Sequence, residues 1–390
     1  MPEICLSTKA WRAGAGWFSQ ELAAAIARAG ATIAFVAPLA EPEAREPSHP
    51  NLSRIVTSRE LLGSHNRLAR WLASARRVVG GLAAVLRLRR STRTFLFSIP
   101  EPLPFSLPLF ALLRLSGAQV VLIVHDALPH AWRLPGWARW LERCGLALSY
   151  RLADRLVCLS GTNAEVLVER FGVPHSKIAV IPHGAFRLPR SVRKPLAGNL
   201  LAFGSIRPNK HVLETIEAVA GLRRRGVPLR LTIAGEVEDP GYWRRCCAAA
   251  RKAPEAFVLR PGFVPDDAMP QLLEEAEAVM LPYGTFASQS GVAVLAGLCG
   301  RPVIATRSGG LAELLDAGLA GEVITEAATP AAIAAAIMRF RAHPPEEWPS
   351  LAEAGKTRLG AALDWDAIGA RYVALLREGN VGADIAAERT

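Results

Sequence analysis

The chain has 390 residues, of which 51% are hydrophobic and 21% charged, and its formal net charge is +11. This composition is typical of folded globular proteins and excludes a largely disordered chain, while the length exceeds one typical core and predicts two domains. The positive charge requires an anionic partner or surface, but no zinc-finger pattern or alternation of aromatic with basic residues occurs, so we do not expect nucleic acid.

The cysteines and the first residues of the chain bear on its compartment. The six cysteines include no Cys-x-x-Cys pair, so neither a zinc site nor a disulfide framework is predicted and a reducing cytoplasm fits best. The N-terminal residues lack the basic and apolar regions of a signal peptide. No apolar run reaches the ~20 residues that a membrane-spanning helix needs. We therefore expect a cytoplasmic protein.

Strand-like and helix-like segments alternate through the first half of the chain. Strands are expected at residues 4–7, 32–37, 95–99, 120–125, 156–160 and 178–182, and helices notably at 17–29, 67–88 and 161–171. Strands this rich in Val, Ile and Leu are buried on both faces. The alternation therefore predicts a doubly wound parallel sheet.

The second half repeats this pattern after a break at residues 187–198, where two prolines and several basic residues indicate a linker. Strands are expected at residues 200–203, 229–234, 258–263, 278–282, 302–306 and 321–324, followed by helices at 331–341, 346–362 and 367–377. We predict an α/β protein of two Rossmann-like domains that face each other across a cleft. In such sheets ligands bind at the carboxyl ends of the strands.

Residues 200–211 form the most informative segment of the chain. They predict a buried strand, a tight turn at Gly204 and the start of a helix, where free N–H groups and the helix dipole favour phosphate. Arg207 and Lys210 add two positive charges at this place, and arginine can bind phosphate oxygens bidentately. An ordinary corner between strand and helix, with solvated basic residues, is the alternative.

Two further candidate segments follow strands of the first half. Gly14 and Gly16 precede a helix and would let a sugar or phosphate approach the backbone, although a plain loop explains them too. The dinucleotide fingerprint needs a third glycine where Ser19 stands, which argues against an NAD-dependent oxidoreductase. His125 and Asp126 end an apolar strand, so His125 could hydrogen-bond a sugar, unless it is a buried and satisfied histidine.

Residues 287–292 precede a helix in the second half. Ser288 and Ser290 could cap this helix while its first N–H groups bind a diphosphate, and Gln289 and Gly291 belong to the same segment. Simple helix capping explains the serines equally well.

The region of residues 61–93 is strongly basic, with eight arginines and no acidic residue. Its apolar residues fall on one helical face, and four arginines lie away from the centre of that face: Arg70, Arg76, Arg77 and Arg87. This pattern favours a helix that lies on an anionic membrane surface. The alternative is a core-facing helix with a solvated basic side.

No metal constellation is evident in the sequence. Asp364 and Asp366 form an Asp-x-Asp pair, but they lie between helical segments and are interpreted as a helix cap. We predict no required metal and no cofactor, because Arg207 and Lys210 would replace a metal electrostatically.

These segments together resemble the retaining glycosyltransferases of the GT-B fold, in the large family 4 that includes sucrose synthases and bacterial mannosyl- and glucosyltransferases. The resemblance covers nearly the whole chain. Its most specific piece is residues 203–210, similar to the family's G-R-x-x-x-x-K donor-phosphate motif. The other matching segments are residues 181–184, 233–236, 261–264, 300–306 and 365–368.

The resemblance implies domains at residues 1–187 for the acceptor and 199–362 for the donor, and a closing helix at 363–390 that crosses back to the first domain. It implies a nucleotide diphosphate sugar as co-substrate, whose diphosphate Arg207 and Lys210 hold. The donor site would also include Gly204, Glu236, Ser288, Gln289, Ser290 and Gly291, with Phe263 and Val264 near the nucleobase. The transferred sugar and the acceptor would face Gly14, Gly16, His125 and Asp126.

One departure from the family pattern concerns its two glutamates eight residues apart. Ala287 and Leu295 occupy those positions here, and the Ser-Gln-Ser-Gly loop resembles the branch of exopolysaccharide and lipopolysaccharide enzymes. Gln289 or backbone N–H groups could substitute for the missing carboxylate.

The predicted function is transfer of a hexose, such as mannose or glucose, from a GDP- or UDP-linked donor to a glycan acceptor in bacterial cell-surface polysaccharide synthesis. The basic helix suggests a polyprenyl-linked or other lipid-linked acceptor and peripheral association with the inner membrane. Two alternatives remain: a non-catalytic GT-B partner that binds nucleotide or glycan, and a sugar-nucleotide epimerase that turns over without an acceptor.

Overall fold

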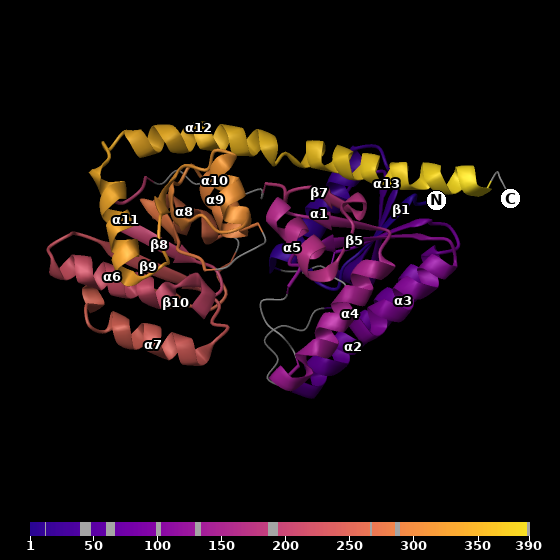
Figure 1. Ribbon diagram of the computed structural model, residues 1–390, viewed down its shortest axis with the longest axis horizontal. Coiled ribbons are helices and arrows are strands. Elements are labelled where there is room, and N and C mark those ends of the chain that lie inside the picture. The colour runs from indigo at the N-terminus through magenta and orange to yellow at the C-terminus, as the bar shows by residue number, and fades with distance from the viewer. Residues whose placement is uncertain are drawn as a thin grey trace. The chain divides into compact units, whose positions relative to one another are not determined.

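The chain divides into two compact units, one formed by Met1–Gly184 with Asp364–Thr390 and the other by Ala185–Leu363 (Figure 1). The computed structural model describes all residues except 12, 40–47, 60–66, 99–102, 129–133, 186–193, 266, 285–288 and 388–390. For residues 13, 59, 67–71 and 379–387 only the backbone is described. Each unit is considered by itself.

The first unit is built on a parallel sheet of seven strands in the order β3-β2-β1-β4-β5-β6-β7. The strand β1 lies in the sheet between β2 and β4, so that Ile4 is in register with Ile33 and Thr94. The strands are β1 (Ile4–Ser7), β2 (Ile33–Leu39), β3 (Leu52–Arg59), β4 (Thr94–Phe97), β5 (Gln119–Val124), β6 (Arg155–Cys158) and β7 (Ile178–Val180).

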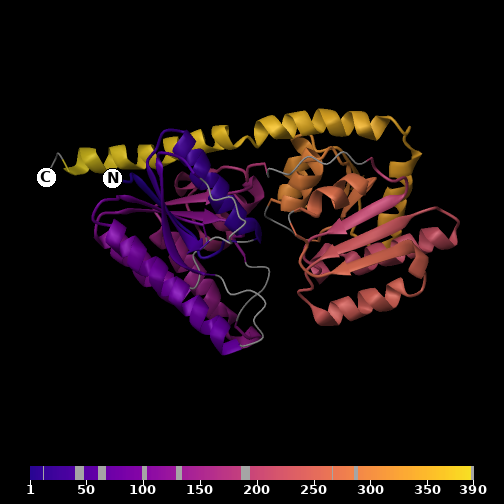
Figure 2. The ribbon, with the colours of Figure 1, turned by 180° about the vertical axis from the view of Figure 1, so that it is seen from behind.

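Helices cover both faces of this sheet, because successive side chains of each buried strand point to opposite sides. Ile4 and Leu6 join the core under α1 (Ala13–Arg28) and α13 (Trp365–Ala387). Cys5, between them, joins the opposite core. That core lies under α2 (Arg67–Leu88), α3 (Leu103–Leu115), α4 (Arg139–Leu152) and α5 (Gly161–Phe171). Figure 2 shows this first unit from behind.

The C-terminal helix α13 packs closely on α1. A Cβ atom at Gly369 would lie 2.5 Å from the carbonyl oxygen of Ala25, so the close approach of the two helices requires glycine. The Arg28 guanidinium donates to Asp366 at 2.6 Å, and Arg377 pairs with Glu3 at 2.9 Å. The last helix thus belongs to the core of the first unit.

The second unit has a parallel sheet of six strands in the order β10-β9-β8-β11-β12-β13. Its strands are β8 (Asn199–Phe203), β9 (Arg230–Gly235), β10 (Phe257–Pro261), β11 (Ala278–Leu281), β12 (Val303–Thr306) and β13 (Gly321–Ile324). Its helices are α6 (Val212–Arg224), α7 (Pro240–Ala250), α8 (Met269–Glu275), α9 (Gly291–Leu298), α10 (Gly310–Asp316), α11 (Pro330–Ala342) and α12 (Glu347–Ala362). Helices α6, α7 and α11 share one core with the strands.

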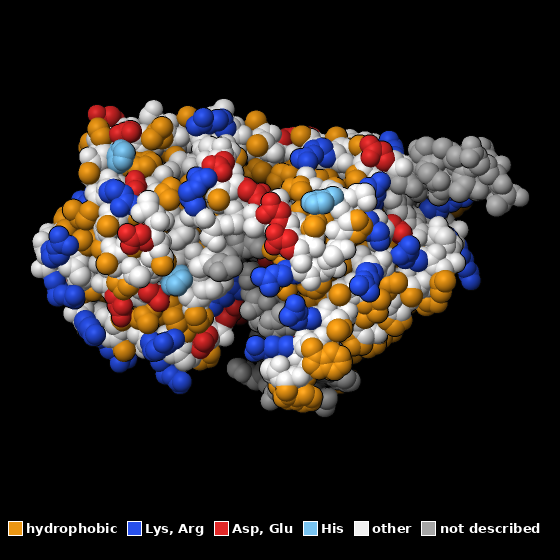
Figure 3. All heavy atoms as spheres, viewed as in Figure 1, with side chains coloured by type: hydrophobic (Ala, Val, Ile, Leu, Met, Phe, Trp, Pro, Cys, Tyr) orange, Lys and Arg blue, Asp and Glu red, His pale blue; other side chains and the backbone are white. Residues whose placement is uncertain are grey.

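The prediction of two parallel α/β domains is confirmed, with local differences. Helix α1 begins at Ala13 rather than at residue 17, so Gly14 and Gly16 lie in its first turns and not in a loop. The sequence did not indicate β3, because this edge strand is mostly polar and basic and only Leu52, Ile55 and Val56 are apolar. Figure 3 shows that hydrophobic and basic side chains both lie on the outer surface over α3 and α4.

Candidate active site

The turn after β8 is held tightly against the end of β9. Gly204 has a φ of +95° and donates its N–H to the Ala234 carbonyl at 3.0 Å. A Cβ atom at Gly235 would overlap the carbonyl of Gly204, so only glycine allows the two backbones to meet here. This contact fixes the start of the predicted phosphate segment.

The residues after the turn form two more backbone hydrogen bonds with the segment that follows β9, and they lead to Arg207. Ile206 donates its N–H to the Glu236 carbonyl at 2.7 Å and accepts from the Glu238 N–H at 3.2 Å. The side chain of Arg207 is only 20% exposed and lies 3.5 Å from the Glu238 carboxylate. Its Nε is buried and has no hydrogen-bond partner among the residues that the structure describes. The carboxylate of Glu238 therefore holds the guanidinium in place, while its Nε–H group has no partner among the described residues and could bind a ligand.

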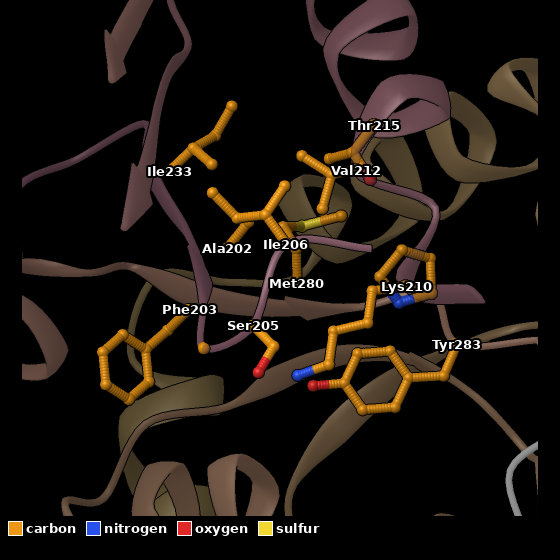
Figure 4. Close-up of a pocket in the computed structure, with 12 residues that line it drawn as sticks. Ala202, Phe203, Ser205, Ile206, Lys210, Val212, Thr215, Ile233, Met280 and Tyr283 are labelled. Carbon is orange, nitrogen blue, oxygen red and sulfur yellow. The ribbon is translucent and has the colours of Figure 1, made fainter. Parts of the chain in front are cut away.

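Lys210 closes a single 3-10 turn (Pro208–Lys210) and folds back over the glycine turn. Its Nζ lies 4.9 Å from the centre of the Tyr283 ring, and a Cβ atom at Gly204 would lie 3.1 Å from it. Figure 4 shows the side chains of Ser205, Lys210 and Tyr283 converging on one side of a small pocket. The pocket is lined by Ala202, Phe203, Gly204, Ser205, Ile206, Lys210, Val212, Thr215, Ile233, Met280, Pro282 and Tyr283.

Polar groups around the start of α6 were not indicated by sequence reasoning. His211 has a φ of +47°, unusual for a residue with a side chain, and its Nδ1 lies 3.5 Å from the Glu214 carboxylate. Buried atoms Asn209 Oδ1 and Glu214 Oε2 lack a hydrogen-bond partner within the described part of the chain. Unsatisfied buried polar atoms are rare in folded proteins, and here they gather beside Arg207 and Lys210.

The N-terminus of α9 lies beside the same turn. Ser290 is buried and its Oγ accepts from the Ala293 N–H at 3.3 Å, which confirms that this serine caps the helix. A Cβ atom at Gly204 would lie 3.3 Å from a methyl group of Val292. The structure thus brings together two segments that the sequence indicated separately, although Ser288 lies outside the described residues and Gln289 is half-buried.

The remaining candidates of the second unit lie at the carboxyl ends of neighbouring strands. Glu236 is exposed directly after β9, and Gly262, with a φ of +124°, donates its N–H to Gly235 at 2.8 Å. Phe263 follows and is exposed, while Val264 is half-buried. The ends of β8, β9 and β10 therefore meet at one edge of the sheet, as expected for a ligand site.

In the first unit, Gly16 has a structural explanation. A Cβ atom there would overlap the carbonyl group of Trp11, which also accepts from Gln20 at 2.7 Å. Glycine at this position lets the loop after β1 fold back on α1. Gly14 is exposed, with open space around it.

The segment after β5 is anchored by a buried asparagine that sequence reasoning missed. Asn163 donates to the Val124 carbonyl at 2.9 Å and accepts from the Ala127 N–H at 2.8 Å. His125 and Asp126, between these anchors, are half-buried at the carboxyl end of the strand. The backbone of the candidate acceptor site is thereby fixed.

Two histidines in this region are neutral at pH 7. His125 lies 3.3 Å from the Ser98 hydroxyl and edge-on to Phe18. Burial lowers its pKa to about 4, although the charge of Asp126 acts in the opposite direction. Burial likewise lowers the pKa of His183 to about 4, despite the hydrogen bond at 2.7 Å between its Nδ1 and the Gly184 carbonyl. Neutral imidazoles can exchange hydrogen bonds with sugar hydroxyls.

The predicted membrane residues lie on α2. Arg76 and Arg87 are exposed and Arg77 is half-buried, whereas the side chain of Arg70 lies outside the described residues. Leu72 and Val79 are exposed beside Arg76 on the outer side of the helix. In the part of the chain that the structure describes, no helix is long and apolar enough to cross a bilayer.

The interpretation of the aspartate pair is confirmed in part. Asp364 accepts from the N–H groups of Asp366 and Ala367 at 3.0 Å, as a helix cap does. Asp366 instead pairs with Arg28. Within the described ranges no three His, Cys, Asp or Glu side chains are grouped as a metal site requires.

Comparison with family models identifies the chain. Residues 12–185 match the model of Glycosyltransferase Family 4, and residues 197–343 match that of Glycosyl transferases group 1. The chain belongs to the family 4 glycosyltransferases with the GT-B fold. The two matches fall on the two structural units in turn, and the second contains the whole Gly204–Lys210 and Ser290–Gly291 site.

Relatives of this family 4 glycosyltransferase differ in the product that they are named for. Glycogen synthase of Mycobacterium tuberculosis is 30% identical over 277 residues, which cover 67% of this chain and 63% of that protein. The chain thus spans less than two thirds of this relative. WcaL of Escherichia coli K12, assigned to colanic acid biosynthesis as a glycosyltransferase, is 29% identical over 188 residues, 45% of each chain.

A solved structure shows the same fold. HepE of Anabaena, in complex with UDP and glucose, superposes with a TM-score of 0.67 at 16% sequence identity, over 97% of this chain and all of that one. This similarity concerns the fold alone.

Proposed function

We propose that this family 4 glycosyltransferase transfers a hexose, such as glucose or mannose, from a UDP- or GDP-linked donor to a glycan acceptor with retention at the anomeric carbon. The observation that carries the proposal is the cluster formed by the Gly204 turn, Arg207, Lys210 and the capped start of α9 within one unit. The UDP and glucose bound to the structurally similar HepE support a nucleotide sugar as donor.

The cluster suits the charge that develops when the nucleotide diphosphate leaves. Arg207 offers a buried N–H without a partner among the described residues, and Lys210 adds an ammonium group over the glycine turn. The first N–H groups of α9 point out of the helix beside them and carry the positive end of its dipole. Groups fixed before the reaction stabilise the departing oxygens without reorganisation, and each such donor is worth about 10²–10³ in rate.

The proposed reaction needs no divalent metal, because Arg207 and Lys210 supply two positive charges against the diphosphate. It also needs no dedicated carboxylate base, since an oxygen of the leaving phosphate can accept the proton of the acceptor hydroxyl. His125 would orient a sugar hydroxyl as a neutral hydrogen-bond partner, in keeping with its lowered pKa of about 4.

We further propose a role in bacterial cell-surface polysaccharide synthesis, with a lipid-linked acceptor at the cytoplasmic side of the inner membrane. The formal charge of +11 and the arginines of α2 support an anionic surface as partner. The similarity to WcaL, assigned to colanic acid biosynthesis, supports the polysaccharide class.

A mass-spectrometric screen tests the proposal. Purified protein is incubated with a panel of UDP- and GDP-sugars, with and without an extract of bacterial lipid-linked glycans. We expect nucleotide diphosphate to be released from one donor, and an acceptor that gains the mass of one hexose. A silent panel with tight nucleotide binding would indicate the non-catalytic partner, and donor turnover without any acceptor would indicate an epimerase.

A further inference from the structure

The outer side of α4 is apolar although its inner side is already packed in the core. Leu146, Ser149 and Tyr150 are buried against the sheet. On the opposite side, Trp137 in the 3-10 turn before the helix (Gly136–Ala138) is 81% exposed and Trp140 is 60% exposed. Leu141 and Leu148 are also exposed and continue the same stripe, because residues 137, 140, 141 and 148 share one face at helical spacing.

Helix α3 adds a second apolar stripe next to the first. Its inner side packs in the core through Leu109, Phe110 and Leu113, while Phe105 and Leu112 are exposed. The two helices lie side by side. A Cβ atom at Gly145 of α4 would lie 2.9 Å from a methyl group of Leu103 of α3, and the C-terminal ends meet where Arg114 donates to the Arg151 carbonyl at 3.2 Å. We call the exposed set the α3–α4 surface: Phe105, Leu112, Trp137, Trp140, Leu141 and Leu148.

The exposed charges that α3 and α4 themselves carry are all positive. Arg139 and Arg143 are exposed beside the tryptophans, and no ion pair joins either of them to a residue that the structure describes. Helix α3 contains no acidic residue. The single acidic residue of α4, Glu142, is buried and accepts from the Leu134 N–H at 3.1 Å. Neither helix therefore exposes a carboxylate, and Figure 3 shows blue and orange side chains together over this region.

We propose that the α3–α4 surface binds an anionic lipid bilayer. Exposed apolar patches of this kind mark interaction sites. Tryptophan is enriched at membrane interfaces, where its ring lies at the level of the headgroups, and each basic side chain near an anionic surface adds to binding. The apolar side chains would insert among the lipids, and the exposed Arg139 and Arg143 would complement the negative charge of the headgroups. An anionic bilayer can accommodate the exposed apolar side chains and the positive charges of this surface together.

The place of the α3–α4 surface in the fold would bring a lipid-linked acceptor to the candidate site, an argument that rests on the proposed function. The connection to α4 leaves the carboxyl end of β5, where His125 lies, and α4 then leads to the beginning of β6. The N-terminal end of α4, with Trp137 and Trp140, therefore lies toward the carboxyl edge of the sheet. A lipid-linked acceptor held in the same bilayer would enter at that edge.

Sedimentation with vesicles tests the proposal on the full chain. Vesicles of phosphatidylcholine alone are compared with vesicles that contain phosphatidylglycerol as well. We expect the wild type to bind the anionic vesicles, and Trp137→Ser/Trp140→Ser and Arg139→Gln/Arg143→Gln each to lower the partition coefficient about tenfold or more. The matched control Met338→Ser/Leu351→Ser, which removes apolar side chains of the second unit that are 40% and 41% exposed, should bind as the wild type does.

Thermal unfolding, oligomeric state and nucleotide binding are measured for the same variants as controls. Thermal unfolding of both double variants should match the wild type, because every replaced side chain is exposed. Unchanged partitioning of the tryptophan variant, or no vesicle binding by the wild type, overturns the proposal. So does a wild-type dimer in solution that the tryptophan variant dissociates, since the occupant is then a second copy. Nucleotide binding is measured in parallel, so failure of the proposed transfer is distinguished from failure of lipid binding.

Discussion

Arg207 is the side chain on which the proposed donor site depends most. In the protein it pairs with Glu238 at 3.5 Å, and that carboxylate is 44% exposed. Ion pairs this close to solvent contribute little stability, so a diphosphate can compete for the guanidinium at small cost. In this proposal Glu238 holds the guanidinium in place, and the buried Nε, which has no partner among the described residues, donates a second hydrogen bond.

Gly204→Ala separates crowding of the site from backbone strain. At a φ of +95° the new side chain is strained, and its Cβ would also press on the Lys210 ammonium and on Val292. We expect a loss of about 1 kcal/mol in the free energy of unfolding. In addition, nucleotide diphosphate binding, measured by calorimetry, should weaken about tenfold or more, because Lys210 must move.

The matched control is Gly226→Ala. Gly226 has a φ of +83° with no atom near the position of a Cβ, so this variant should lose similar stability while binding nucleotide as the wild type does. Equal nucleotide affinity in the two variants would contradict the placement of Lys210 in the donor site.

His183 makes stability depend on pH. Its pKa is lowered from 6.5 to about 4 by burial, so the unfolded chain takes up the proton first as the pH falls. The contribution of this residue to the free energy of unfolding is therefore complete above about pH 6.5 and falls by about 2 kcal/mol by pH 5. Denaturant titrations at pH 7 and pH 5 measure the loss. His183→Asn, which can still donate to the Gly184 carbonyl, should show a smaller difference; an equal difference would assign the effect elsewhere.

At the scale of elements, Ser290 at the start of α9 distinguishes capping from phosphate binding. Ser290→Ala removes the acceptor of the Ala293 N–H and should cost about 1 kcal/mol of stability. Ser290→Asp keeps a cap and favours the helix dipole, but it brings negative charge to the proposed diphosphate. We therefore expect near wild-type thermal stability and markedly weaker nucleotide binding for the aspartate variant.

The opposite result for this pair of variants is equally informative. If Ser290→Asp binds UDP and GDP as tightly as the wild type, the start of α9 lies away from the diphosphate and its serine acts as a cap alone.

Some local features could be predicted from sequence patterns, whereas others depend on tertiary packing. The strand before the Gly204 turn followed from local composition, because buried parallel strands are continuous apolar runs. The role of Gly16 did not follow, because it depends on the loop at Trp11 folding back on α1. The apolar face of α2 was visible at helical spacing, whereas the outer stripe of α4 was not, since only the structure shows which of its two apolar sides is buried.

For the whole molecule, alternation of strands and helices was enough to predict two parallel α/β domains, and the family match agrees. The strand orders, with β1 between β2 and β4 and with β8 between β9 and β11, result from the crossover connections. The sites required more than the order of elements. Glu238 and Asn163 act through contacts with residues that are distant in the sequence, and their residue types alone carry no signal.

The central claim is that Arg207 and Lys210 bind the diphosphate of a nucleotide sugar. Isothermal titration of UDP and GDP into Arg207→Ala and Lys210→Ala, beside the exposed control Arg244→Ala, measures it most directly. Because a hydrogen bond to a charged group is worth about 1.5–3 kcal/mol, each site variant should bind the preferred nucleotide at least about tenfold more weakly, with unfolding and the control unchanged. Wild-type affinity in both site variants would contradict the account.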